Sequence, residues 1–290
     1  MKVLTVKIKK WISGCLSDKM FLKIQYYRKF NKFLNLKSPQ TLNEKLQWLK
    51  LYDRTPLHTV CADKLKVRNH IKEVLGEEYL IPLVLSTKNV NDITPDNLPN
   101  YPVIIKTNHD SGTYFIIKNK ESQNWKEIRA KLSKSLKVNY YKAGREWQYK
   151  NIEPFIIVEK LLINNNGTRI EDYKFECFNG NAEMINVDFN KEDVHKRNNY
   201  DINWNLLPIL WPKEILNGHD IPKPKELESM IKLAEKLASD FCFCRVDFYF
   251  FEDKIFFGEI TFHPTSGYGQ FYPEEKDLYY GNLIKLPKKQ

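Results

Sequence analysis

A two-residue turn signal lies between two alternating runs of sequence near the middle of the chain. Asn179-Gly180 separates Asp172–Phe178 from Ala182–Phe189. Asn and Gly tolerate the positive φ angles that a two-residue hairpin turn requires, and alternation is the side-chain period of a half-buried strand. This pattern predicts an antiparallel hairpin and constrains the fold around it to an antiparallel sheet.

Further strands surround this hairpin, and one long helix interrupts them. Residues 15–75 show helix-like apolar stripes, and 79–85 predict a strand or an extended linker. Apolar side chains at helical spacing, after two prolines, predict a helix over 224–241. The order helices, strands, helix and hairpin indicates an α+β or mixed α/β fold with largely antiparallel sheets. With no G-x-G-x-x-G motif, a doubly wound Rossmann fold is disfavoured. The other predicted strands, which precede an irregular tail, are Pro102–Thr107, Tyr114–Lys118, Phe155–Leu162, Cys242–Phe251 and Ile255–Thr261.

The last two strands bring two carboxylates together. A three-residue turn centred on Asp253 places Asp247 opposite Glu259, and Arg245 opposite Thr261. Directly opposed residues share a face, with Cβ atoms about 4.5–5.5 Å apart. A two-residue turn would instead send Glu259 to the other face.

Asp247 and Glu259 are therefore candidate Mg²⁺ ligands. Two carboxylates at so short a distance repel each other unless positive charge lies between them. Mg²⁺ can supply this charge, because it binds a small set of carboxylates when phosphates complete its octahedron. The alternative is one solvated carboxylate and one carboxylate paired with Arg245.

Two further strands offer cations for phosphates. Lys106 ends an apolar strand, and a short polar loop with Ser111 and Gly112 follows it. The backbone N–H groups of such a loop can hold phosphates while the lysine supplies a point charge. Lys174, in the alternating run Asp172–Glu176, offers a second cation. The alternatives are an ordinary surface hairpin and a strand with its charges in solvent.

Two weaker candidates complete the set. Backbone groups past the strand that contains Glu159, Lys160 and Leu162 can pair with an adenine edge, so these residues are candidate nucleotide contacts. Arg197 is a candidate for contact with substrate or phosphate, and a mobile basic loop explains its position equally well.

The net charge of +10 indicates an anionic partner. Lysines crowd the first fifty residues among aromatic side chains, which fits nucleic acid, an anionic membrane face or an acidic polysaccharide; a solvated basic surface is the alternative. No nucleic-acid-binding motif is present, which disfavours nucleic acid. The chain has no apolar run of spanning length, its lysines interrupt any signal-peptide core, and its five cysteines lack metal spacing. We therefore expect a cytoplasmic protein with reduced cysteines.

The order of these features resembles the ATP-grasp superfamily. Arg245-Val-Asp247-Phe is similar to the metal-binding strand of D-alanine–D-alanine ligases, and Asp63-Lys64 with Arg68 and Gly76 is similar to their entry helix. Over about residues 20–285 the chain resembles more closely the TupA-like ATP-grasp proteins of polysaccharide biosynthesis. The motifs that carry this resemblance are Thr41-Leu-Asn-Glu-Lys-Leu-Gln-Trp48-Leu, Ala62-Asp-Lys64, Leu98-Pro-Asn, Lys106-Thr-Asn-His, Asp172-Tyr-Lys174-Phe-Glu-Cys-Phe-Asn-Gly180 and Phe257-Gly-Glu259-Ile-Thr261-Phe.

The resemblance implies an ATP-grasp fold with ATP held between two β-rich lobes. It divides the chain into a helical basic region over 1–75, an N-lobe with the phosphate loop over 76–158, and a C-lobe with the metal and catalytic hairpin over 159–290. It also implies an ADP-forming carboxylate–amine ligase of bacterial surface-polysaccharide biosynthesis, which uses ATP and Mg²⁺. The implied partners are an anionic polysaccharide or sugar acid and an amino acid or amine. The basic N-terminal region also fits a peripheral contact with the cytoplasmic membrane face.

Residue by residue, the resemblance places Lys106 and Lys174 on the ATP phosphates. It gives Arg245 and Lys174 catalytic roles, with Arg245 stabilising the tetrahedral intermediate. Lys64 and Arg197 are weaker candidates for substrate contacts.

Two departures from the family pattern bear on nucleotide and metal binding. Asp110 stands where the phosphate loop usually carries a glycine, and Thr261 stands where most members have an asparagine metal ligand. The alternative functions are a glycosyltransferase of the same pathway and a non-catalytic protein that binds anionic glycans.

Overall fold

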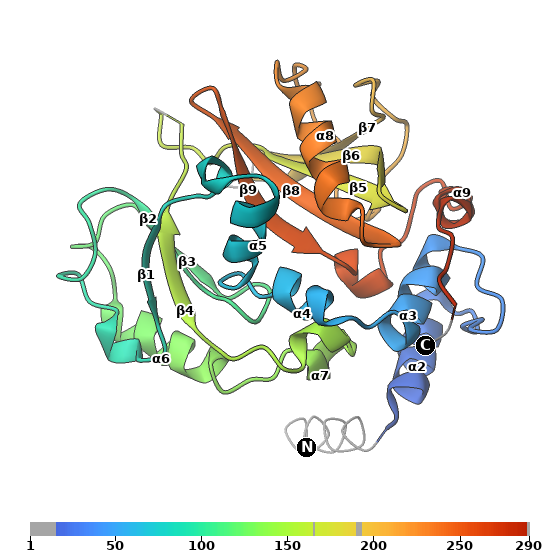
Figure 1. Ribbon diagram of the computed structural model, residues 1–290, viewed down its shortest axis with the longest axis horizontal. Helices are drawn as coiled ribbons and strands as arrows, with labels where there is room; N and C mark the ends of the chain where they lie inside the picture. The colour runs from blue at the N-terminus through green and yellow to red at the C-terminus, as the bar shows by residue number, and fades with distance from the viewer. Residues whose placement is uncertain (1–15, 165, 190–192, 289–290) are drawn as a thin grey trace.

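Two antiparallel sheets form two β-rich lobes in the computed structural model (Figure 1), which describes residues 16–164, 166–189 and 193–288. The smaller sheet has the strand order β1-β4-β2-β3 and the larger β7-β6-β5-β8-β9. The predicted α+β class is confirmed. The strands are β1 Leu83–Thr87, β2 Val103–Thr107, β3 Tyr114–Ile117, β4 Ile156–Lys160, β5 Asp172–Phe178, β6 Asn181–Phe189, β7 Lys196–Tyr200, β8 Phe243–Phe251 and β9 Lys254–Thr261.

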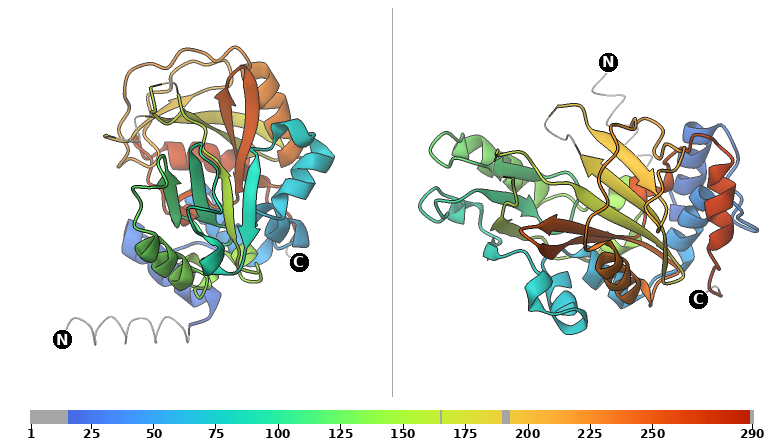
Figure 2. Two further views of the ribbon diagram at one scale, coloured as in Figure 1. Left: turned by 90° about the vertical axis from the view of Figure 1, so that its left-hand side faces the viewer. Right: turned by 90° about the horizontal axis from the view of Figure 1, so that it is seen from above.

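Helices cover both sheets and fill the end of the molecule nearest the chain termini (Figures 1 and 2). None of the helices in the described part of the chain is long and apolar enough to cross a membrane. The α-helices are α2 Asp18–Phe30, α3 Leu42–Tyr52, α4 Pro56–Ala62, α5 Val67–Val74, α6 Trp125–Ser135, α7 Tyr141–Gly144, α8 Leu227–Ala238 and α9 Lys276–Leu283. The 3₁₀ helices are η1 Glu77–Tyr79, η2 Val90–Asp92, η3 Trp147–Tyr149 and η4 Pro264–Gly267.

The hairpin at Asn179-Gly180 is confirmed. Both residues have positive φ angles, 48° and 89°, as the two-residue turn requires. Helix α8 is also confirmed, because its apolar stripe packs on one face of the large sheet and buries Met230, Ala234 and Leu237.

Two expectations for the C-terminal half were wrong. The mobile basic loop that was the alternative explanation for Arg197 is instead the edge strand β7, paired with β6. The strand was not predicted because its side chains are polar and show no apolar alternation. They are buried against partners far along the chain. The tail after Thr261 is not irregular throughout: it contains α9, which packs against α3. Its apolar residues follow no clear period alone and find their partners only in the folded chain.

Three apolar cores determine which part of the large sheet is left for charged side chains. One lies between the large sheet and α8, and one between the small sheet and α6. The third gathers Phe178, Met184 and Phe243 of the large sheet with α2, α3 and α9. This third core covers one end of the sheet face opposite α8. A smaller cluster of Ile81, Leu162 and Ile170 packs against Tyr249 and Phe251 farther along β8, so polar residues occupy the part of the face between them.

Candidate active site

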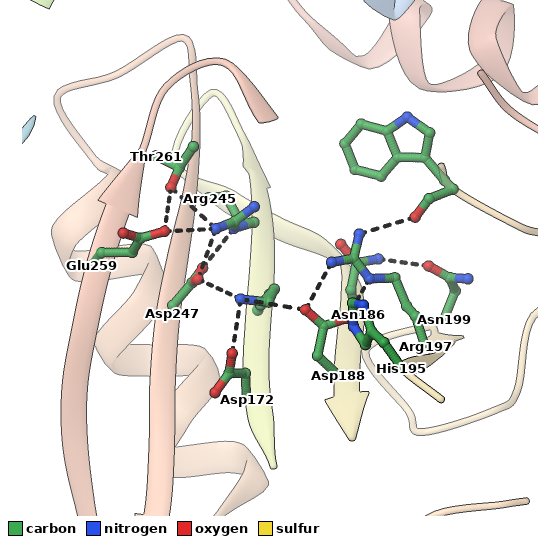
Figure 3. Close-up of polar contacts among 12 residues, drawn as sticks. Asp172, Asn186, Asp188, His195, Arg197, Asn199, Arg245, Asp247, Glu259 and Thr261 are labelled. Carbon is green, nitrogen blue, oxygen red and sulfur yellow. Dashed lines mark hydrogen bonds and ion pairs between the residues drawn. The ribbon is translucent and has the colours of Figure 1, made fainter. Parts of the chain in front are cut away.

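One face of the large sheet carries polar side chains from all five strands. The opposite face packs on α8, because successive side chains of a strand point to opposite sides. Figure 3 shows most of these residues linked by ion pairs and hydrogen bonds across β9, β8, β5, β6 and β7. They are Asp172, Lys174, Glu176, Asn186, Asp188, Arg197, Asn199, Arg245, Asp247, Glu259 and Thr261.

A β-bulge sets the register of the hairpin that carries the two candidate metal ligands. Asp247 pairs with Glu259, and Arg245 with Thr261, as predicted. The predicted three-residue turn is wrong: Phe251 pairs with Lys254 across two residues with positive φ angles.

The shift that restores Glu259 to the face of Asp247 falls at Gly258. An extra residue in one strand reverses the side-chain alternation beyond it. A Cβ atom on Gly258 would lie 3.0 Å from the Asp247 carbonyl oxygen. Glycine therefore permits the close backbone approach on which the carboxylate pair depends.

Arg245 joins the carboxylates through a forked contact. Its Nε lies 2.6 Å from Asp247 Oδ1, and its Nη2 lies 2.7 Å from Asp247 Oδ2. The same Nη2 donates to Glu259 Oε1 at 3.0 Å and to Thr261 Oγ1 at 3.1 Å. Thr261 in turn donates to Glu259 Oε1. Thr261 thus orients both Arg245 and Glu259.

Lys174 lies on the other side of Asp247. Its Nζ is 2.8 Å from Asp247 Oδ2, 3.2 Å from Asp172 Oδ2 and 3.6 Å from Asp188 Oδ2. Burial by itself lowers the pKa of Lys174, but Asp247 and Asp172 outweigh burial and raise it. The lysine is therefore a fixed positive charge within three carboxylates.

Glu176 differs from its neighbours because neither of its carboxyl oxygens has a hydrogen-bond partner within the described residues. Its side chain is fully buried, opposite Arg245 on the neighbouring strand. Burial raises its pKa to about 8, although Arg245 acts in the opposite direction. Glu176 is consequently protonated at neutral pH.

Glu259 stays ionised, and Lys64 lies near it. Burial raises the pKa of Glu259, but Lys64, Arg245 and Lys174 outweigh burial and lower it to about 2. Burial lowers the pKa of Lys64, while Glu259 raises it and Lys106 lowers it further. The Lys64 Nζ donates to the Asp110 carbonyl at 2.5 Å. Lys64 therefore links the carboxylate hairpin to the small lobe.

The small-lobe candidates meet at Glu159. Lys106 Nζ lies 2.6 Å from Glu159 Oε2, and Arg68 Nη1 lies 3.0 Å from Glu159 Oε1. A cavity of about 60 Å³ between the lobes is lined by Lys106, Glu159, Lys160, Leu162 and Tyr249, among others. The structure thus brings the candidate nucleotide contacts of β4 together with Lys106.

Asp110 closes the candidate phosphate loop on itself. Its carboxylate accepts hydrogen bonds from Thr107 at 2.5 Å, Thr113 at 2.8 Å and Ser135 at 2.5 Å. These bonds tie both ends of the loop to α6. The carboxylate therefore serves as the anchor of the loop, while Ser111 and Gly112 remain exposed.

We expect Asp110→Ala to lower the free energy of unfolding by about 2–3 kcal/mol, because three hydroxyls lose a buried charged acceptor. The KM for ATP should also rise, while kcat changes less. Urea denaturation and ATP-dependent kinetics measure the two effects. Asp96→Ala, at an exposed position of the same lobe, is the control. An unchanged KM for ATP would contradict an anchoring role.

Sequence reasoning missed a buried polar cluster beside this region. Lys50 Nζ donates to the Gly144 carbonyl at 3.0 Å and to the Ser266 carbonyl at 2.8 Å. His263 lies 3.8 Å from Glu146, whose charge also acts on Lys50. Burial lowers the pKa of Lys50 to about 8. The cluster joins α3 to α7, η4 and the residues beside them. These helices are about one turn long, which is too short to show a periodic pattern.

Two tyrosines bridge from this cluster toward the candidate site. Tyr140 forms a side-chain hydrogen bond with Ser111 of the phosphate loop, and its ring contacts Tyr149 edge-on at 5.0 Å. Burial raises the pKa of Tyr149 well above its ordinary value, with added effects of Glu146 and Glu259.

Arg197 lies on the same sheet face but away from the hairpin. Its Nε and Nη2 contact Asp188 at 2.5 and 2.8 Å, and its Nη1 donates to the Trp211 carbonyl at 3.1 Å. The alternation of Asn186 and Asp188 in the predicted strand 182–189 was the available signal for this extension of the network.

The donor set at the hairpin fits Mg²⁺. Glu259 Oε2 has no hydrogen-bond partner within the described residues, and its side chain is 40% exposed. Asp247 is buried and shares its oxygens with Arg245 and Lys174. No group of three or more His, Cys, Asp or Glu in the described ranges is arranged to hold a metal. Waters or phosphate oxygens would complete the coordination of a Mg²⁺ ion bound here, as is usual for that ion.

A family model described as TupA-like ATPgrasp matches residues 44–285. The chain belongs to the TupA-like ATP-grasp family. No curated protein sequence matches this family member significantly.

Several solved ATP-grasp structures are similar to this TupA-like chain at low identity. D-alanine–D-alanine ligase from Bacillus anthracis, complexed with ATP, is 16% identical with a TM-score of 0.40; the alignment covers 70% of this chain and 55% of that one. The D-alanine–D-alanine ligase from Helicobacter pylori is 18% identical with a TM-score of 0.43, and the alignment covers 84% of this chain and 69% of that one. The ATP-grasp ligase PsnB, complexed with a phosphomimetic precursor variant, Mg and ADP, is 10% identical with a TM-score of 0.43. That alignment covers 81% of this chain and 61% of PsnB. The chain thus spans little more than half the length of the Bacillus ligase.

Proposed function

We propose that this protein is an ADP-forming ligase that activates the carboxylate of a sugar acid with ATP and joins it to an amino acid or small amine. The proposed setting is bacterial surface-polysaccharide biosynthesis in the cytoplasm. The observation that carries the proposal is the convergence of Lys174, Arg245, Asp247 and Glu259 on one sheet face. The family to which the chain belongs supports the use of ATP.

In the proposed reaction, a substrate carboxylate oxygen attacks the γ-phosphorus of ATP and ADP leaves. The amine then attacks the acyl phosphate, phosphate leaves, the amide forms and one proton is released. Lys106 and Lys174 bind the phosphates as fixed positive charges. Arg245 stabilises the negative oxygen of the tetrahedral intermediate. Asp247 and Glu259 hold Mg²⁺, which neutralises phosphate charge when bound.

The arrangement also accounts for the work of the neighbouring residues. Thr261 holds Glu259 and Arg245 in place, so a hydroxyl stands in the position of the usual asparagine without breaking the network. Asp110 anchors the phosphate loop in place of a glycine. Both departures therefore leave the site ordered, which favours an enzyme over a binding protein that has lost its active site.

The test is ADP and phosphate release with Mg-ATP across a panel of uronic acids paired with amino acids and small amines. We expect release that requires both a carboxylate and an amine, together with an amide product identified by mass spectrometry. ADP formation with a carboxylate alone, trapped as hydroxamate by hydroxylamine, would support the first half-reaction. Sugar transfer from a nucleotide sugar, or an absence of Mg-ATP binding, would overturn the proposal.

A further inference from the structure

One face of α2 exposes apolar side chains. Met20, Ile24 and Tyr27 are 39–50% exposed, and Phe33, just past the helix, is 87% exposed. The three helical positions are spaced i, i+4 and i+7, so they form one stripe. The ring of Phe33 stacks on Tyr27 with centroids 5.2 Å apart and extends the stripe.

The opposite face of α2 explains why this stripe is left outside. Phe21, Leu22 and Tyr26 are buried in the core shared with α3 and α9. The helix is therefore fixed to the body of the protein by one side, and the exposed stripe is a rigid feature of the surface.

Positive charge borders the stripe. Lys19, Lys23 and Arg28 are exposed, and none of them forms an ion pair with a described residue. Lys29 and Lys32, by contrast, form ion pairs with Glu214 and Glu274. The free cations are thus concentrated beside the apolar side chains.

The chain preceding α2 has the same character. Residues 1–15 contain four lysines, one tryptophan and neither Asp nor Glu. In the sequence, only Leu16 and Ser17 separate this stretch from α2.

We propose that this face of α2, with Phe33, docks the protein onto the surface of an anionic lipid bilayer. Apolar side chains with flanking lysines and arginines are the composition of helices that lie in the membrane interface. Each cation near such a surface adds to the attraction. An acidic polysaccharide would satisfy the cations but offers no apolar phase for Met20 and Ile24, so the stripe favours lipid.

The charge side of the proposal is tested by flotation of the full chain with phosphatidylcholine vesicles, with and without phosphatidylglycerol. We expect binding only with phosphatidylglycerol, and weakening by salt. Replacing Lys19, Lys23 and Arg28 with Gln should weaken binding roughly a hundredfold, at about fivefold per cation. A matched variant replaces Lys223, Lys232 and Lys236 with Gln near and on α8 at the opposite side of the molecule (Figure 1), and should bind as wild type.

The apolar side is tested by Ile24→Ser with Phe33→Ser, which should weaken binding roughly tenfold. Ile202→Ser with Leu216→Ser, two exposed apolar positions elsewhere, is the control. Equal loss in the α8 and α2 charge variants would overturn a specific docking face. So would vesicle binding unchanged by the apolar variant, or light scattering that shows a dimer disrupted by it. These outcomes are independent of ligase activity, because flotation needs neither ATP nor substrate.

Discussion

Asp247→Asn is expected to lower the rate of ADP formation by on the order of a thousandfold, the upper range for removing one key electrostatic group. Asp247 accepts from Arg245 at 2.6 and 2.7 Å and from Lys174 at 2.8 Å. The amide has a similar shape but no charge, so it can neither hold Mg²⁺ well nor balance two buried cations. The measurement is kcat and KM for ATP with the substrate pair found for wild type.

The control is Asp172→Asn, the same chemical change on the other side of Lys174. Asp172 Oδ2 lies 3.2 Å from Lys174 Nζ but outside the hairpin. We expect its rate to stay within about tenfold of wild type. Both variants lose stability, so each is assayed at a temperature where urea denaturation shows it folded. Equal rates for the two variants would contradict the assignment of Asp247 to the reacting end of the face.

Glu176→Gln is expected to remove a large pH dependence of stability. The pKa of Glu176 is about 8 in the folded protein, against an ordinary value of 4.5. The folded state therefore holds a proton that the unfolded chain releases, and the stability contributed by this group is lost as pH rises from about 4.5 to about 8. Between pH 5.5 and pH 8 the wild type should lose about 3 kcal/mol through this group.

The measurement is the free energy of unfolding in urea at several pH values for both proteins. We expect the difference between them to change by this amount, with the variant the more stable relative to wild type at pH 8. Other carboxylates titrate equally in both proteins and cancel in the comparison. Glu228→Gln, at an exposed position of α8, should keep the wild-type slope. If the free energy of unfolding of Glu176→Gln depended on pH in the same way as that of wild type, Glu176 would be ionised in the folded protein, which would contradict this prediction.

The sequence by itself determined most of the strands and much of the charged face. Alternation in 172–178 and 242–251 assigned Lys174, Arg245 and Asp247 to faces of strands, because side-chain direction in a strand depends only on position parity. The Asn179-Gly180 turn then made the strands on either side of it neighbours. These features are local, so residues adjacent in the chain were enough to predict them.

Tertiary structure decided how the predicted pairs are aligned and which other charges join them. The Gly258 bulge, rather than the length of the turn, aligns Asp247 with Glu259. Tyr140, Glu146 and His263 come from segments without period to surround Lys50 of α3, and β7 and α9 are ordered by distant partners. Such contacts cost the chain entropy that only the assembled core offsets. For this reason no local sequence pattern predicted these contacts, and only the packed tertiary structure brings these residues together around the site.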